Sequence, residues 1–258
     1  MIETSTGRLA AAEFVGTLIV MLGGPGLIVL GGDDIGPLGI ALGFGASMAL
    51  AIGVIGAVAN PMFSLALWFS KGIATRELFA DWIGQFVGAI VGALLIFGMN
   101  DSTRFTSATN GWQPGDSVAT GVDVGIHLSG FADLGVVLAA ELVLGTIVVV
   151  ILLSAISRLL SNSAVAAFTG TAYAIATLFL LSMSGAGINP ARSLGIALFA
   201  ETDPNALVQL WAFVLVPVGA AFAGTLVWLA IDDATIDDTV FDDTFLEDAS
   251  DRVTHDHP

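Results

Sequence analysis

An Asn-Pro dipeptide occurs twice in this chain, each time inside an apolar stretch and shortly after a glycine. The two copies are Asn60-Pro61 and Asn189-Pro190. Asn is a favoured N-cap residue and Pro fits the first helical position, so each dipeptide predicts a helix start. A helix start leaves backbone N–H groups without intrahelical partners. At membrane depth such groups are tolerated only beside a water-filled path or a binding site.

The composition places the chain among membrane proteins. Of its 258 residues, 55% are hydrophobic and only 12% are charged, and the mean hydropathy is +0.90. Soluble domains carry about 25% charged residues. Several apolar runs reach the roughly 20 residues that a helix needs to cross a bilayer. We therefore expect a multi-pass helical protein of the lipid bilayer, and the lack of cysteine excludes disulfides.

Hydropathy and the positions of Gly, Pro and polar residues divide the chain into spans and connections. The six predicted spans cover about residues 9–30, 37–57, 77–99, 132–156, 164–184 and 207–231. Two shorter apolar segments, 61–70 and 190–200, follow the Asn-Pro dipeptides and are about half a span long. The longest connection, 100–131, is rich in Gly, Ser, Thr and Asp and is expected outside the membrane.

The two halves of the chain repeat the same features in register. Glu141 follows Glu13 by 128 residues, and Asn189 follows Asn60 by 129. Each half holds three spans and one half-span, and because three is odd the second half must be upside down relative to the first. The sequence therefore predicts an all-α membrane protein with six transmembrane helices and two half-helices in an inverted repeat. The interrupted helices are expected to meet near the midplane.

The charged residues predict an orientation and a tail. With both termini cytoplasmic, five of the seven basic residues fall inside, as the positive-inside rule expects. The formal net charge is −16, and ten acidic residues lie between Asp232 and the end beside one basic residue, Arg252. We expect a cytoplasmic N-terminus over 1–8 and an acidic, disordered cytoplasmic tail over 232–258. Such acidity with very few Lys favours a halophilic prokaryotic source.

The predicted half-helices should point their N-termini at one another from opposite faces. Each terminus carries about half a positive charge, and the amides of Asn60 and Asn189 add N–H donors. A water there can accept a hydrogen bond from each asparagine, while paired positive helix ends oppose cations, including protons. One Asn-Pro alone would be interpreted as an ordinary cap. Two at matched positions of an inverted repeat favour a path that passes neutral solutes and rejects ions.

Three features together resemble a known family. They are the pattern Gly-Ala-x-x-Asn-Pro, the sequence Ile188-Asn189-Pro190-Ala191-Arg192-Ser193, and a glutamate in spans one and four. In a six-span chain they look like the aquaporin or major intrinsic protein family. Two positions of the first motif depart from the family pattern, because Met62 replaces the usual Ala and Val58 replaces a common His.

The resemblance covers one channel domain, about residues 9–231, with half-repeats of about 9–115 and 132–231. It implies a passive channel rather than an enzyme, with no cofactor and one pore per protomer. The expected permeants are water and small neutral solutes such as glycerol, with ions and protons excluded. The resemblance also implies a homotetramer, and we expect it in the cell membrane.

The resemblance also implies the residues of the narrowest constriction, or selectivity filter. Arg192 would be its cationic wall, which donates hydrogen bonds to the permeant and repels cations; a structural ion pair is the alternative. Thr177 and Ala186 follow by their offsets in the sequence, and the fourth residue is Phe44, with Leu42 as an alternative. With Thr and Ala the constriction should be wider than a His-bearing water filter. The constriction lacks the two aromatic residues that would hold the carbon backbone of glycerol, so the residue pattern favours water as the permeant.

Three buried polar residues are expected inside the spans. Glu13 and Glu141 are carboxylates at matched positions, and isolated burial would be costly, so they should hydrogen-bond to backbone. The resemblance favours a role in holding the loops that carry the half-helices, and a proton relay is the alternative. Gln85 is a further candidate brace, and Tyr173 is interpreted as a packing residue.

Two other functional classes compete with a channel. A coupled secondary transporter also uses inverted repeats and broken helices, but it needs acceptor groups for a coupling ion. A membrane-embedded enzyme would need converging acid and base groups, and the only buried carboxylates expected lie in opposite halves. We find no catalytic triad, no metal-ligand spacing and no nucleic-acid footprint.

Overall fold

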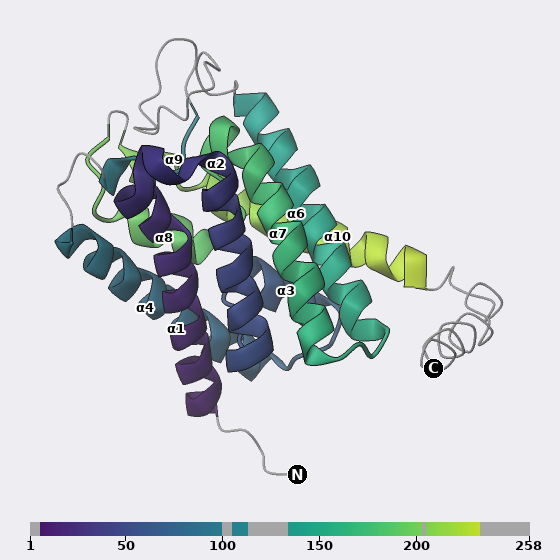
Figure 1. Ribbon diagram of the computed structural model, residues 1–258. Helices are drawn as coiled ribbons and strands as arrows, with labels where there is room; N and C mark the ends of the chain where they lie inside the picture. Colours follow the sequence, from purple (N-terminus) through teal and green to yellow (C-terminus); the bar gives the residue numbers. More distant parts are fainter. Residues whose placement is uncertain (1–5, 100–104, 113–133, 203–204, 233–258) are drawn as a thin grey trace, which may run out of the picture.

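The computed structural model describes residues 6–99, 105–112, 134–202 and 205–232. Within these residues every regular element is a helix, and six stretches are long and apolar enough to cross a membrane (Figure 1). The elements are α1 (Thr6–Gly23), α2 (Pro25–Leu50), a π-helical turn (Ala51–Ile55), α3 (Pro61–Phe69), α4 (Thr75–Gly98), α6 (Leu134–Ser157), α7 (Asn162–Ser184), α8 (Pro190–Ala197), α9 (Ala206–Gln209) and α10 (Ala212–Asp232). The predicted all-α membrane fold is confirmed.

The first span contains a helix break that the sequence does not predict. The predicted spans, 9–30 and 37–57, agree with the membrane-capable stretches, but α1 ends at Gly23 and α2 begins at Pro25. Proline at the first helical position favours a new helix, because it cannot continue the hydrogen bonds of the preceding one. The membrane-capable stretches are Thr6–Gly31 and Asp34–Ile55. The chain therefore reverses direction within α2, which bends over at the top of Figure 1.

Each half-helix follows a glycine that changes the direction of the chain. Gly56 ends the π-helical turn and Gly185 ends α7, both with φ of 77°. Glycine adopts this left-handed conformation without the steric cost that a Cβ would bring. The chain is then extended at Asn60 and Asn189, after which the half-helices α3 and α8 begin. Helix α8 ends at Ala197, three residues before the predicted end.

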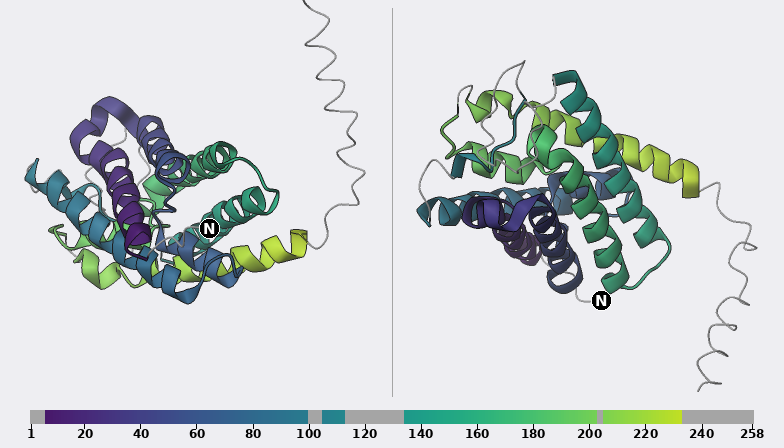
Figure 2. Two further views of the ribbon diagram at one scale, coloured as in Figure 1. Left: turned by 90° about the horizontal axis from the view of Figure 1, so that it is seen from below. Right: turned by 45° about the horizontal axis from the view of Figure 1, so that its top comes forward.

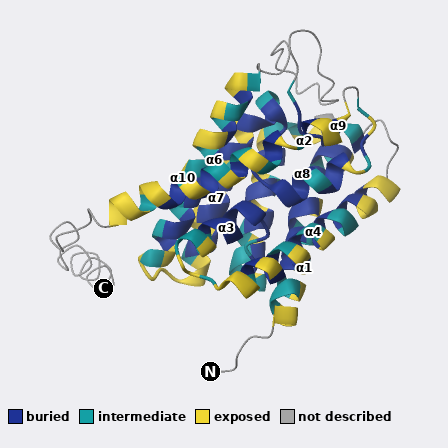
Figure 3. Ribbon diagram, turned by 180° about the vertical axis from the view of Figure 1, so that it is seen from behind, coloured by how far each residue is buried: buried dark blue, intermediate teal, exposed yellow. Residues whose placement is uncertain are grey.

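The inverted repeat is visible in how the helices pack. Helix α1 packs on α4 and α6 packs on α10, which are equivalent pairs in the two halves, while α2 packs on α7 across the halves. Each half-helix lies against a span of the other half, α3 against α10 and α8 against α4 (Figures 1 and 2). Figure 3 shows buried residues around α3 and α8 and exposed residues along the outer faces of the spans. The two halves are therefore interlocked around their half-helices.

Glycines allow the closest helix contacts. Helices α2 and α7 cross at Gly45 and Gly170, where a Cβ added at Gly170 would lie 2.6 Å from the carbonyl oxygen of Gly45. A Cβ added at Gly88 in α4 would lie 2.5 Å from the carbonyl oxygen of Phe14 in α1. Gly84 and Gly92 of α4 lie similarly close to α1. Small residues allow this backbone approach in membrane helices, so these three glycines of α4 serve packing within the protomer.

The predicted domain boundaries remain predictions. Residues 1–5 and 233–258 lie outside the described part of the chain, and with them most of the predicted N-terminal segment and acidic tail. Much of the predicted connection between the halves, 113–133, also lies outside it.

Candidate functional site

The two asparagines cap the half-helices that they precede. The side-chain oxygen of Asn60 accepts a hydrogen bond from the backbone N–H of Met62 at 2.9 Å. The oxygen of Asn189 accepts from the N–H groups of Ala191 and Arg192 at 3.1 and 3.2 Å. Each cap uses the amide oxygen and leaves the NH₂ group of the asparagine available for other contacts.

The amide NH₂ groups then join the two halves at the centre of the protein. Asn60 Nδ2 donates to the carbonyl of Ile188 at 3.1 Å, and Asn189 Nδ2 donates to the carbonyl of Ala59 at 2.9 Å. Each asparagine therefore binds the carbonyl just before the other one. Both side chains are completely buried. An amide NH₂ has two donors, so each asparagine has one N–H beyond this pair of bonds.

In the first half, the Glu13 carboxylate holds the chain just before Asn60. Its two oxygens accept hydrogen bonds from the backbone N–H groups of Val58 and Ala59 at 2.7 and 2.8 Å. The amide of Gln85 donates to the same carboxylate at 2.8 Å and to the hydroxyl of Ser64 in α3 at 2.9 Å. The loop and the half-helix are thus tied to α1 and α4 at one point.

In the second half, Glu141 occupies the equivalent position with fewer partners. One carboxylate oxygen accepts from the backbone N–H of Gly187 at 2.6 Å and from the Ser184 hydroxyl in a short hydrogen bond. The other oxygen, Oε2, is buried and has no partner among the described residues. Glu141 therefore holds its loop through one backbone N–H group where Glu13 uses two.

Arg192 is the largest fully buried side chain in the described part of the protein. Its guanidinium lies over the ring of Phe44, with 5.6 Å between the central carbon and the ring centroid. Its Nη1 donates a short hydrogen bond to the side-chain oxygen of Asn110. Nε and Nη2 have no partner among the described residues, so the guanidinium has unused donors. No carboxylate hydrogen bond to Arg192 is present among these residues.

Asn110 is a site residue that the sequence analysis missed. Its side-chain oxygen accepts from Arg192 and from the Ser193 hydroxyl at 2.8 Å, while its Nδ2 donates to the carbonyl of Ser184 at 3.1 Å. It lies in the connection between the halves, within a buried stretch, 107–111. An Asn among Gly, Ser and Thr residues gives no sequence signal for this contact, which depends on the tertiary fold.

The other three predicted filter residues, Phe44, Thr177 and Ala186, are all buried. Phe44 is fully buried beneath Arg192, whereas the alternative, Leu42, is 56% exposed on the outer surface. Thr177 in α7 is buried, and its hydroxyl has no partner among the described residues. Ala186 is buried directly after Gly185, and its φ of 62° makes it one of the few non-glycine residues in the left-handed region.

Tyr173 packs against aromatic rings from two other helices. It lies on α7 one turn before Thr177 and is 1% exposed. Its ring lies 6.3 Å from the ring of Phe44 and 6.1 Å from that of Phe63, between centroids. Phe63 is in α3, three residues after Asn60. Tyr173 therefore lies between the ring beneath Arg192 and the start of α3.

A family model described as Major intrinsic protein matches residues 2–228, nearly the whole chain. This chain belongs to the major intrinsic protein family. Two relatives are named Aquaporin Z. The one from Brucella melitensis biotype 1 is 31% identical over 226 residues, which cover 84% of this chain and 95% of the relative. The one from Photorhabdus laumondii subsp. laumondii is 27% identical over 226 residues, which cover 84% and 94%.

A solved structure of the same family supports the fold. The X-ray structure of the aquaglyceroporin from Plasmodium falciparum superposes with a TM-score of 0.66 at 18% identity, and the match covers 92% of this chain and 99% of that one. The predicted family and the six-span fold with two half-helices are confirmed. Major intrinsic proteins are channels rather than enzymes, so the predictions of a channel and of a multi-pass membrane protein are also confirmed.

Proposed function

We propose that this major intrinsic protein is a passive channel for water and, more slowly, small neutral solutes such as glycerol, and that it excludes ions and protons. The observation that carries the proposal is the reciprocal pair of hydrogen bonds between Asn60 and Asn189. These bonds bring the N-termini of α3 and α8 together inside the protein, where each asparagine keeps one more N–H donor.

Electrostatics supports the exclusion of cations. The N-termini of two half-helices meet at the asparagine pair, and each carries about half a positive charge. The buried guanidinium of Arg192 lies one turn further along α8 and adds a full charge. A cation would meet positive potential at both points, with little water to screen it. A neutral molecule that accepts hydrogen bonds meets donors there instead.

Phe44, Thr177, Ala186 and Arg192 are our proposed selectivity filter. We infer that this filter has a polar side and an apolar side, and one observation supports each. Arg192 Nε, Arg192 Nη2 and the hydroxyl of Thr177 are buried without partners among the described residues, while the Phe44 ring lies against the guanidinium. Unpaired buried polar groups are costly, and a permeant can pair with them. Asn110 holds the guanidinium from its other end.

Water is the favoured permeant for two reasons. The filter has one aromatic residue, Phe44, and no second aromatic at Ala186 to grip a carbon backbone. The relatives at 27–31% identity are both named Aquaporin Z. The likeness to an aquaglyceroporin structure concerns the fold alone. The alternative is that glycerol passage is the main role. Stopped-flow measurement of both fluxes distinguishes this alternative from a water channel.

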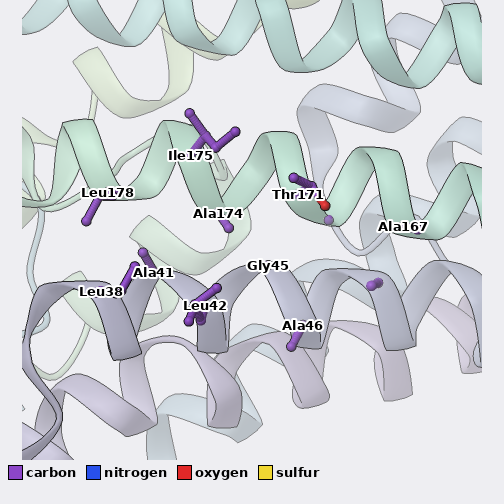
Figure 4. Close-up of a pocket in the computed structure, with 12 residues that line it drawn as sticks. Leu38, Ala41, Leu42, Gly45, Ala46, Ala167, Thr171, Ala174, Ile175 and Leu178 are labelled. Carbon is purple, nitrogen blue, oxygen red and sulfur yellow. The ribbon is translucent and has the colours of Figure 1, made fainter.

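The placement in the cell and the assembly are also part of the proposal. We propose the cell membrane, with both termini in the cytoplasm, and a homotetramer, as the family resemblance implies. An apolar groove of about 390 Å³ lies between α2 and α7 on the outer surface (Figure 4). Its lining includes Leu38, Leu42, Ala46, Ala174, Ile175 and Leu178. A helix of a second copy would fit this groove, and native mass spectrometry from detergent would test the assembly; a monomer mass would contradict it.

The function is tested by stopped-flow light scattering on proteoliposomes that hold the purified protein. Water-driven shrinkage and glycerol-driven re-swelling are recorded in the same preparation. We expect shrinkage well above that of empty liposomes and re-swelling much closer to theirs. Fast re-swelling would make the protein a small-solute facilitator, and neither flux above background in folded protein would contradict a channel.

A further inference from the structure

The aromatic side chain of Tyr173 occupies the centre of the protein, beside groups that the proposed function assigns to the pore. It is on α7, which also carries Thr177 one turn further along, and it is buried. Its ring contacts Phe44 of α2 at 6.3 Å in a tilted geometry and Phe63 of α3 at 6.1 Å edge to face, between centroids. The rings of Phe44, Tyr173 and Phe63 therefore come from three helices and lie close together in the interior.

The contacts place Tyr173 between the proposed filter and the asparagine pair. Phe44, on one side of it, lies beneath the guanidinium of Arg192. On the other side lies Phe63 of α3, three residues after Asn60. On the proposed path, a molecule that moves from the level of Arg192 to the level of the asparagine pair passes the Tyr173 ring.

The hydroxyl of Tyr173 also makes the two half-repeats unequal. The residue 129 positions before Tyr173, at the equivalent place in the first repeat, is Phe44, which has no hydroxyl. A phenol hydroxyl can donate and accept hydrogen bonds. On the proposed path, a water would therefore meet a hydroxyl from the second half in addition to the N–H donors of the two asparagines.

The position of Tyr173 also limits the size of the molecules that can pass. A tyrosine ring that packs against aromatic rings on two sides has little freedom to turn away. A single-file water needs only a narrow passage beside it, whereas a solute with a carbon backbone needs the ring to move.

We propose that Tyr173, held between Phe44 and Phe63, is a specificity-determining residue that narrows the pore between the filter and the asparagine pair and slows polyols relative to water. The inference rests on the proposed channel function. It assigns the slow passage of glycerol mainly to this aromatic ring, and not to the wider filter of Thr177 and Ala186.

The test compares Tyr173→Val with Phe179→Leu by stopped-flow light scattering. Phe179 is on the same helix but 62% exposed on the outer surface, so its variant is a matched control. We expect Tyr173→Val to raise the ratio of glycerol to water permeability about tenfold or more, and Phe179→Leu to leave it unchanged. Size-exclusion chromatography and thermal unfolding show that each variant is folded. A folded Tyr173→Val with the wild-type ratio would overturn the inference.

Two further variants keep the test decisive if Tyr173→Val does not fold. Tyr173→Trp enlarges the ring and should lower water permeability about fivefold or more, while Tyr173→Phe keeps the ring and should retain glycerol exclusion. Equal water permeability in the Trp and Phe variants would overturn the inference. If folded wild type and all folded variants conduct neither water nor glycerol, the channel function itself fails, and the inference with it. A folded wild type that conducts neither water nor glycerol, beside a conducting Tyr173→Val, would contradict the proposed water channel and support a pore that the Tyr173 ring narrows.

Discussion

The two half-repeats share a backbone plan but differ at equivalent side chains. In the first half, Glu13 accepts two backbone N–H groups and the amide of Gln85. In the second half, Glu141 accepts one backbone N–H and the Ser184 hydroxyl, and one oxygen has no partner among the described residues. The first half is therefore the more tightly braced.

The two halves also differ in the residue three positions after each asparagine. It is Phe63 in the first half and Arg192 in the second. The first half contributes an apolar ring to the centre, and the second contributes a buried charge with free donors. On the proposed function, the first half mainly supports the fold of the pore and the second contributes most of the residues that select what passes.

The largest effect is expected from removing the braces. Glu13→Ala would leave three buried donors without their acceptor, at about 1–3 kcal/mol for each. Glu141→Ala should cost less, because only Gly187 loses its acceptor while Ser184 can still donate to the carbonyl of Leu180 at 3.2 Å. Thermal unfolding in detergent measures both. A larger loss in Glu141→Ala would reverse the comparison.

The next effect concerns the residue three positions after each asparagine. Arg192→Val should widen the filter and remove a buried positive charge, so cation leak and glycerol flux should both rise, by about tenfold or more. Phe63→Val removes a ring but no charge, and cation leak should stay at the wild-type level. Ion flux into dye-loaded proteoliposomes measures this. Background leak together with unchanged solute selectivity in Arg192→Val would show that the arginine is structural.

A smaller effect is expected from Asn110→Ala. The variant removes the oxygen that holds Arg192 Nη1 and the Ser193 hydroxyl, so the guanidinium can move into the path of the permeant. We expect water permeability to fall about two- to fourfold, which corresponds to about 0.4–0.8 kcal/mol and lies near the lower end of the net contribution of one hydrogen bond. Asn205→Ala is the control, because Asn205 only caps α9. Equal stopped-flow rates in both variants would contradict a positioning role for Asn110.

The smallest effect is expected at the acidic tail, which neither half-repeat includes. Deletion of the residues after Ile231 should leave water permeability within about twofold of the full-length chain, because a highly charged segment is expected to stay solvated. The rates per mole of reconstituted protein measure this. A folded but inactive truncated channel would show that the tail takes part in conduction.

Much of the fold could be predicted because its signals are local or repeated. Asn60, Asn189 and their prolines mark the half-helices directly, and the spacing of the glutamates reveals the repeat. The break at Gly24 was harder, because hydropathy stays high across it and only Pro25 marks the new helix.

Less of the site could be predicted from the chain alone. Arg192 was identifiable because an arginine at membrane depth is unusual. Asn110 and Tyr173 were not, since an Asn in a polar connection and a Tyr in an apolar span are ordinary by sequence. Asn110 contacts Arg192, and Tyr173 contacts Phe44 and Phe63. These partners are more than 80 residues away in the chain, and only the folded protein brings them together. The halophilic source stays a prediction.

The central claim is that the half-helix pair conducts water while excluding protons and cations. The most direct test loads proteoliposomes with a pH-sensitive dye and applies an osmotic step and a pH step to the same preparation. We predict volume change well above that of empty liposomes, while the dye responds at the rate of empty liposomes. A proton flux that rises together with water flux, or no water flux from folded protein, would contradict the account.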